Sequence, residues 1–133
     1  MDHTQKITDF LGPIEVLDNL EDTPDAEGLE LKGGSSYLLY KVDGEVKFHQ
    51  VEEDAVTFIG RSTFSDIRFD DASVSRKHAL IRLKDGRASL IDNRSLNGIY
   101  LNGERIDESA LSSGDVFHVG RHAITFISVP SEV

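Results

Sequence analysis

Three short polar segments of this chain carry side chains that could bind an anion. They are Gly60-Arg61-Ser62, Ser73-Val74-Ser75-Arg76-Lys77-His78 and Asp92-Asn93-Arg94-Ser95-Leu96-Asn97-Gly98. Together they offer the cations Arg61, Arg76, Lys77 and Arg94, the hydroxyls of Ser62, Ser75 and Ser95, and the amide of Asn97. Guanidinium forks, hydroxyls and the N–H groups of turns are the donors that proteins use for oxyanions, and a phosphate group matches them best. The residue types therefore predict a phosphate receptor.

The elements that must position these segments are short and β-prone. From Tyr37 onward such runs recur at the spacing typical of all-β sandwiches and barrels, and no long helical stripe follows residue 30. Pairs such as Asp43-Gly44 and Asn102-Gly103 separate the runs and supply the positive φ angles of tight hairpins. Strands are predicted over 37–42, 46–51, 56–59, 67–69, 79–83, 88–91, 99–101, 116–119 and 123–127. The sequence thus predicts an all-β fold whose loops hold the binding groups.

Charge is unevenly distributed along the chain. The net charge is −10 over 133 residues, and residues 1–30 hold nine acidic side chains against the single base Lys6. Such an excess of negative charge disfavours nonspecific binding to nucleic acid or to an anionic membrane. The chain has no cysteine, no apolar run long enough to span a membrane and no basic, apolar start typical of a secretory signal. We expect a cytoplasmic protein.

The acidic N-terminal part has two interpretations. Its apolar residues fall about three or four apart, as on one helix face, but Gly12-Pro13 interrupts the pattern. It is either a largely disordered, flexible tail or a linear docking motif that folds on a partner. Residues 22–34, rich in glycine, indicate a linker. The predicted organisation is therefore a tail and linker over 1–35, a sandwich over 36–128 and a short tail over 129–133.

Enzymatic activity is not expected. The sequence has no Gly-x-Ser-x-Gly elbow, and a phosphatase would need a metal cluster or a cysteine nucleophile. The histidines at 49, 78, 118 and 122 lack a matching set of carboxylates. We therefore expect no catalytic residue, no metal and no cofactor. A phospho-independent interaction or scaffold domain is the main alternative to a phosphate-reading domain.

The three segments together resemble one known family. Gly60-Arg61, then Ser75-Arg76-Lys77-His78, then Ser95-Leu96-Asn97-Gly98 are similar to the Gly-Arg, Ser-x-x-His and Ser-x-Asn-Gly motifs of the forkhead-associated (FHA) domain. The order and the spacing of the motifs also fit, and the resemblance covers roughly residues 36–128. It implies an eleven-stranded β-sandwich that binds phosphothreonine peptides through loops at one end.

The resemblance also implies roles for single residues. Arg61 would pair with the phosphate, the Ser75 hydroxyl would donate a second hydrogen bond, and Asn97 would hold the peptide backbone. Further contacts are implied for Arg76, Lys77, Ser95 and Leu96, while His78 would brace the loops and Gly60 and Gly98 would form turns. Capping of their own turns competes with binding at Ser75, Ser95 and Asn97, and Arg76, Lys77 and Arg94 could simply be solvated charges.

Two further features concern the family pattern. Ile99 stands where the family often has threonine after Asn-Gly, which predicts a change in packing. The chain also resembles small bacterial single-FHA regulators with an acidic tail. In these proteins a kinase phosphorylates a tail threonine, which then occupies the protein's own binding site. Thr23 is the candidate here, with Thr4 and Thr8 as alternatives. The expected partner is a phosphothreonine-containing protein, such as a Ser/Thr kinase or its substrate, bound by a monomer.

Overall fold

The computed structural model describes residues 4–6 and 30–131, and within them the chain forms strands joined by turns. The strands are β1 (Thr4–Lys6), β2 (Glu30–Lys32), β3 (Ser36–Val42), β4 (Glu45–Val51), β5 (Ala55–Gly60), β6 (Ile67–Arg68), β7 (Ala79–Lys84), β8 (Arg87–Asp92), β9 (Ile99–Leu101), β10 (Glu104–Ile106), β11 (Glu108–Leu111), β12 (Val116–Val119) and β13 (His122–Ser128). None of these residues belongs to a helix long and apolar enough to cross a membrane.

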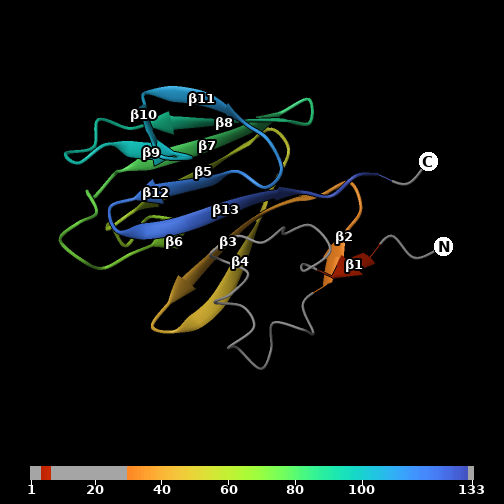
Figure 1. Cartoon of the computed structure of the whole chain (residues 1–133), viewed down its shortest axis with the longest axis horizontal. Coiled ribbons are helices and arrows are strands. Elements are labelled where there is room, and N and C mark those ends of the chain that lie inside the picture. The colour runs from red at the N-terminus through yellow and green to blue at the C-terminus, as the bar shows by residue number, and fades with distance from the viewer. Residues whose placement is uncertain (1–3, 7–29, 132–133) are drawn as a thin grey trace.

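Strands β3 to β13 form two sheets that pack on each other (Figure 1). One sheet has six strands in the order β10-β9-β12-β13-β3-β4, and the other has five in the order β11-β8-β7-β5-β6. Only the short β5–β6 pair is parallel. The inner faces enclose one apolar core that includes Leu38, Ile81, Leu90 and Phe117, all fully buried. The all-β, eleven-stranded sandwich implied by the family resemblance is confirmed.

Local sequence explains most of this arrangement. In β7 the inward Ala79, Ile81 and Leu83 are buried and alternate with more exposed neighbours, because successive side chains of a strand point to opposite faces. Both residues of the turn pairs Asp43-Gly44 and Asn102-Gly103 have positive φ angles. Such turns match the twist of the strands that they join. The predicted hairpins therefore form at the predicted places.

Strand β11 was not predicted. Its sequence, Glu108–Leu111, contains no β-branched residue, and each of the nine predicted strands lies elsewhere. It forms because it pairs along the edge of β8, from Glu108 opposite Ile91 to Leu111 opposite Ala88, and because Leu111 is buried in the core. Tertiary pairing here outweighs the weak local preference.

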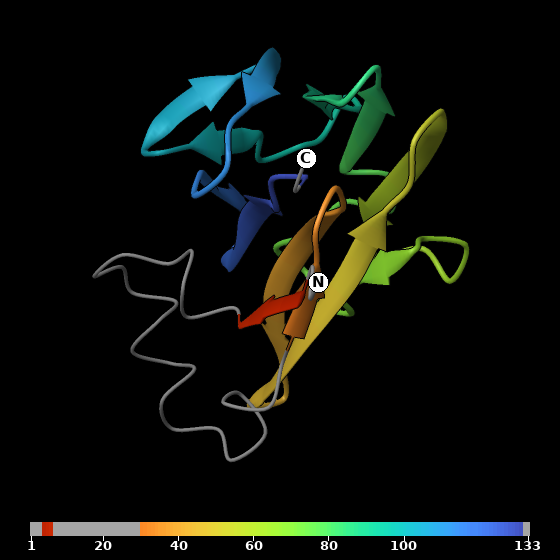
Figure 2. The same cartoon turned by 90° about the vertical axis from the view of Figure 1, so that its right-hand side faces the viewer.

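Order also extends into the segment interpreted as tail and linker. Strands β1 and β2 pair antiparallel and lie near the end of β13 (Figures 1 and 2). Leu31 is fully buried, and the Gly34 N–H donates to the carbonyl of Val129 at 2.9 Å. Residues 30–32 are therefore a strand packed on the sandwich rather than linker, and the buried Val129 extends the packed unit beyond residue 128. The two interpretations of the tail concern residues 7–29, which lie outside the described residues.

Candidate functional site

The three polar segments meet at one end of the sandwich. They are the loops 61–66 after β5, 69–78 after β6 and 93–98 after β8. The Arg61 N–H donates to the carbonyl of Ser75 at 2.9 Å, which joins the first loop to the second. The Leu96 N–H donates to the Ser75 hydroxyl at 3.0 Å, which joins the third loop to the second. Segments separated in sequence thus form one continuous surface, with Ser75 at its centre.

Gly60 makes the close approach of the first two loops possible. A Cβ atom at this position would lie 2.2 Å from the carbonyl oxygen of Arg76, which is backbone and cannot move aside. The residue ends β5 in ordinary extended conformation, so the expectation that it forms a turn is wrong. Gly98 differs, because its φ of 80° is a turn conformation that favours glycine.

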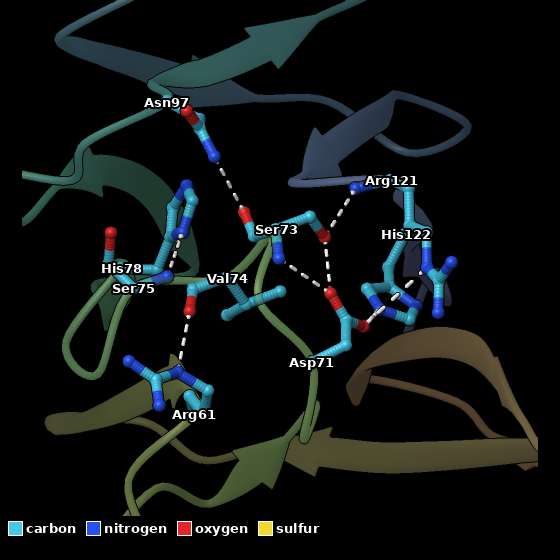
Figure 3. A network of polar contacts seen from close by, with 9 residues as sticks. All are labelled: Arg61, Asp71, Ser73, Val74, Ser75, His78, Asn97, Arg121 and His122. Carbon is cyan, nitrogen blue, oxygen red and sulfur yellow. Dashed lines mark hydrogen bonds and ion pairs between the residues drawn. The ribbon is translucent and has the colours of Figure 1, made fainter.

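Arg61 is partly buried and is oriented by the second loop. Its Nε–H donates to the carbonyl of Val74 at 3.1 Å (Figure 3). The guanidinium makes no ion pair with any residue of the described ranges. Its terminal N–H groups therefore remain as donors in a fork suited to a phosphate or a carboxylate.

The Ser75 hydroxyl is oriented by a hydrogen bond that it accepts. Its oxygen accepts the N–H of Leu96, so the hydroxyl proton remains available to an incoming oxyanion. Leu96 itself is 85% exposed at the tip of the third loop. The same geometry therefore fixes the third loop and leaves a donor beside Arg61.

His78 connects the second and third loops from inside the protein. It is fully buried, and its Nδ1 accepts the N–H of Ser75 at 3.0 Å. The proton of a neutral imidazole then lies on Nε2, which donates to the carbonyl of Gly98 at 2.8 Å. Both ring nitrogens are thus used, one within the second loop and one between the second and third loops, and neither faces a ligand.

Ser95 and Asn97 hold the third loop. The Ser95 N–H donates to Asp92 Oδ1 at 2.9 Å, and its hydroxyl accepts the N–H of Gly98, also at 2.9 Å. The Asn97 Nδ2 donates to the carbonyl of Ser73 at 3.1 Å (Figure 3). The hydrogen bonds of Ser95 therefore lie within its own turn, whereas that of Asn97 crosses to the second loop. The exposed Asn97 amide retains its oxygen and a second N–H for a ligand.

The remaining cations lie on the second and third loops. Arg76, Lys77 and Arg94 are exposed, and none is within ion-pair distance of an acidic residue in the described ranges. Ile99 is fully buried at the start of β9, so it occupies a packing position. No group of three or more histidine, aspartate or glutamate side chains among residues 4–6 and 30–131 could hold a metal ion.

A second network of polar contacts stabilises the second loop. Asp71 Oδ1 accepts hydrogen bonds from the Ser73 N–H at 2.8 Å and from the Ser73 hydroxyl at 2.5 Å (Figure 3). Asp71 Oδ2 contacts Nε2 of His122, and the Arg121 Nε lies 3.6 Å away. The Ser73 hydroxyl in turn accepts the Arg121 N–H at 3.2 Å. The network joins the second loop to the turn before β13.

This network keeps Asp71 ionised. The hydrogen bond from the Ser73 hydroxyl, with a smaller contribution from His122, holds the pKa of Asp71 well below its usual range, against an opposing effect of burial. In the sequence, His122 stood out only as a histidine without a matching set of carboxylates, and no motif included Asp71. The two lie 51 positions apart, so no local pattern shows their contact.

The comparisons with known proteins agree with this geometry. Residues 57–120 match the sequence profile of the FHA domain. The glycogen accumulation regulator GarA of Mycobacterium tuberculosis is 33% identical over 125 residues, covering 93% of this chain and 77% of that protein. The oxoglutarate dehydrogenase inhibitor of Corynebacterium glutamicum is 34% identical over 110 residues, covering 82% of this chain and 77% of that protein.

The solved structures include a similar sandwich. A structure from a structural and functional analysis of phosphothreonine-dependent FHA domain interactions has a TM-score of 0.67 at 33% identity. The match covers 72% of this chain and 98% of that chain. The motifs at Arg61, Ser75 and Asn97 all fall within the matched segment 57–120. Because the motifs, the sandwich and the relatives agree, this chain belongs to the FHA domain family.

Proposed function

We propose that this chain reads phosphothreonine in a protein partner and acts as an adaptor or regulator in Ser/Thr kinase signalling, without catalysing a reaction. The observation that carries the proposal is the pairing of Arg61 with Ser75 on adjacent loops. Arg61 offers a charged fork and Ser75 offers a hydroxyl proton, and each is oriented by a hydrogen bond to the neighbouring loop. Two kinds of donor converging from a rigid scaffold suit a compact dianion such as a phosphate group.

The surrounding charge supports the same ligand. Arg76 and Lys77 on the second loop and Arg94 on the third add three exposed cations to these loops, although the whole chain has a net charge of −10. Partial burial of Arg61 reduces the screening of its charge by salt. The relatives named above are a regulator of glycogen accumulation and an inhibitor of oxoglutarate dehydrogenase, and the related structure concerns phosphothreonine-dependent interactions. A regulatory role for a monomer in the cytoplasm is part of the proposal, with a phosphorylated kinase or kinase substrate as partner.

Calorimetric titration with four matched peptides tests the proposal. The phosphothreonine peptide is expected to bind more tightly than its unmodified and glutamate counterparts by about tenfold or more, because these lack the dianion and its acceptor oxygens. The phosphoserine peptide is expected to bind less tightly than the phosphothreonine peptide, as the family implies. Affinity is also expected to fall as salt is added. Equal affinity for all four peptides would instead favour a phospho-independent interaction domain.

Self-binding of a phosphorylated Thr23 is part of the proposal, and it depends on how far the chain between Thr23 and β2 can reach. Strand β13 begins beside Ser73 at the site, and it ends beside Gly34, close to β2. Seven residues of strand span about 20–24 Å. The seven steps from Thr23 to Glu30 reach about 23–25 Å when stretched. With β2 in place, the reach of this segment is therefore comparable to the length of β13, and release of β2 would extend it.

Phosphorylation of the whole chain followed by amide NMR tests this self-binding. Shifts at Arg61, Ser75 and Asn97 are expected in the chain phosphorylated at Thr23 and are expected to be absent in Thr23→Ala treated in the same way. Shifts that persist in the variant would assign the bound residue to Thr4 or Thr8. Unchanged loop signals after confirmed modification of Thr23 would exclude self-binding through that residue.

A further inference from the structure

The second loop is held in two parts that depend on different elements. Residues 74–78 are fixed from the first loop, because the Arg61 N–H donates to the carbonyl of Ser75 at 2.9 Å. Residues 71–73 are instead in contact with the turn 120–121, which joins β12 to β13. The part of the loop beside Arg61 and the part before it therefore have separate supports.

The turn between β12 and β13 lies directly against Ser73. A Cβ atom at Gly120 would lie 2.4 Å from the hydroxyl oxygen of Ser73 and 2.6 Å from its carbonyl oxygen. Gly120 also has a φ of 58°, so both the available space and the backbone conformation favour glycine. The Arg121 N–H donates to the same hydroxyl at 3.2 Å (Figure 3). The position of Ser73 is therefore set by a hairpin that is remote in sequence.

Asp71 connects Ser73 to the first side chain of β13. Its Oδ1 accepts the N–H and the hydroxyl of Ser73, and its Oδ2 contacts Nε2 of His122. The His122 ring stacks on Phe69, with ring centroids 4.1 Å apart and planes inclined by 15°. Because Phe69 is buried in the core, this stacking fixes the imidazole, and the Asp71 carboxylate meets a side chain of defined position.

The same chain of contacts ends at Asn97 on the third loop. The exposed Asn97 donates from Nδ2 to the Ser73 carbonyl at 3.1 Å, its one side-chain hydrogen bond within the described residues. Asn102, in the other Asn-Gly pair, is held at both amide atoms, by Asp115 Oδ1 and by the Val116 N–H, each at 3.1 Å. The direction in which Asn97 presents its remaining oxygen and N–H thus depends on where Ser73 lies.

We propose that Asp71 and His122 are positioning residues for the backbone of a phosphothreonine-bearing ligand. They act through Ser73, whose carbonyl orients Asn97. The inference rests on the proposed phosphothreonine function, in which Asn97 holds the ligand backbone. The phosphate contact is supported separately, from the first loop. The network therefore determines how tightly the peptide part of the ligand is held, and leaves the attraction for the phosphate group unchanged.

Two probes separate these parts of the ligand on the full chain. Inorganic phosphate reports the phosphate contact alone, and the phosphothreonine peptide of the calorimetric test also reports the contact with the ligand backbone. Asp71→Ala is expected to weaken peptide binding about three- to tenfold, the range of one lost hydrogen bond, and to change phosphate binding less than about twofold. Calorimetry measures the peptide, and amide NMR shifts at constant ionic strength measure the weaker phosphate.

Further variants test which side-chain groups carry the effect. His122→Phe keeps a ring to stack on Phe69 but has no nitrogen for Asp71. Ser73→Ala lacks the hydroxyl that Asp71 and the turn share, and it removes little volume, so it keeps the test open if Asp71→Ala does not fold. Both are expected to lose peptide affinity as Asp71→Ala does. Ser73→Thr keeps the hydroxyl and is expected to bind the peptide as the native chain does.

Asp115→Ala is the matched control. Asp115 also holds a turn, since its Oδ2 accepts the Ser112 N–H at 2.7 Å. It directly precedes β12, whereas the turn 120–121 follows it, so the two lie at opposite ends of that strand. Binding of both probes to Asp115→Ala is expected to equal that of the native chain. Thermal melts check that each variant is folded.

The two probes also separate failure of the positioning role from failure of the proposed function. An equal loss of peptide and phosphate binding in Asp71→Ala would show general support of the loops and overturn the positioning role. Unchanged peptide binding in both Asp71→Ala and Ser73→Ala would overturn it as well. A native chain that binds the phosphothreonine peptide no better than its unmodified counterpart would refute the proposed function and, with it, this inference.

Discussion

Replacement of Arg61 by alanine is expected to weaken binding of a phosphothreonine peptide by about tenfold or more while the fold is retained. Truncating one partner of a buried, hydrogen-bonded charge pair costs about 2–5 kcal/mol, because the other charge is left without compensation. Arg61 is partly buried, and its only side-chain hydrogen bond within the described residues is to the Val74 carbonyl. Its loss is therefore expected to remove the proposed phosphate contact and little of the packing. Isothermal titration calorimetry measures the change in affinity.

Two further variants make this test specific. Arg61→Lys keeps the charge but lacks the planar fork, so an intermediate affinity is expected. Arg82→Ala is the matched control, because Arg82 is an exposed arginine on the outer face of β7 that belongs to none of the three loops. Its affinity is expected to equal that of the native chain. Equal affinity of Arg61→Ala and the native chain would refute the assigned site.

Replacement of His78 by alanine is expected to lower the free energy of unfolding by about 2–5 kcal/mol. The change leaves the partly buried Ser75 N–H and the buried Gly98 carbonyl without their partners, and a buried group left unpaired costs about 1–3 kcal/mol. The cavity left by the fully buried ring adds to this loss. Urea unfolding followed by circular dichroism measures the difference.

His49 provides the comparison for this variant. It is half-buried on β4, away from the three loops, and makes no side-chain hydrogen bond with the described residues. His49→Ala is therefore expected to change the free energy of unfolding by less than about 1 kcal/mol. His78→Ala should also weaken phosphopeptide binding, since Ser75 loses its support. A loss as small as that of His49→Ala would show that His78 does not brace the loops.

Much of the sandwich could be predicted because its causes are local. Alternating burial along β7 follows from the two-residue period of a strand, and the Asn102-Gly103 turn follows from residues that tolerate positive φ. The motifs around Arg61, Ser75 and Asn97 were also recognisable, since each is a short run at a fixed spacing. The fold that these motifs implied is the fold observed.

Other features depend on chain segments that meet only in the folded protein. Strand β11 forms because β8 offers it an edge, and Gly60 is needed because the backbone of Arg76 passes 2.2 Å from where a Cβ would stand. The contact of Asp71 with His122 joins positions 51 residues apart. Local sequence cannot encode such contacts, because they depend on the distance between elements that the packing of the two sheets sets.

The surface beside the site also combines features that follow from local sequence with features that depend on packing. The sequence alone indicates which residues offer donors to a phosphate and which loops carry them. The row of Phe58, Leu80 and Ile91 on the outward face forms only in the folded protein, because cross-strand register places residues of three strands side by side. Packing also makes residues 30–32 part of the folded unit, since burial of Leu31 requires neighbours that the local composition does not reveal. Residue types thus specify the chemistry of this protein, and packing specifies which groups act together.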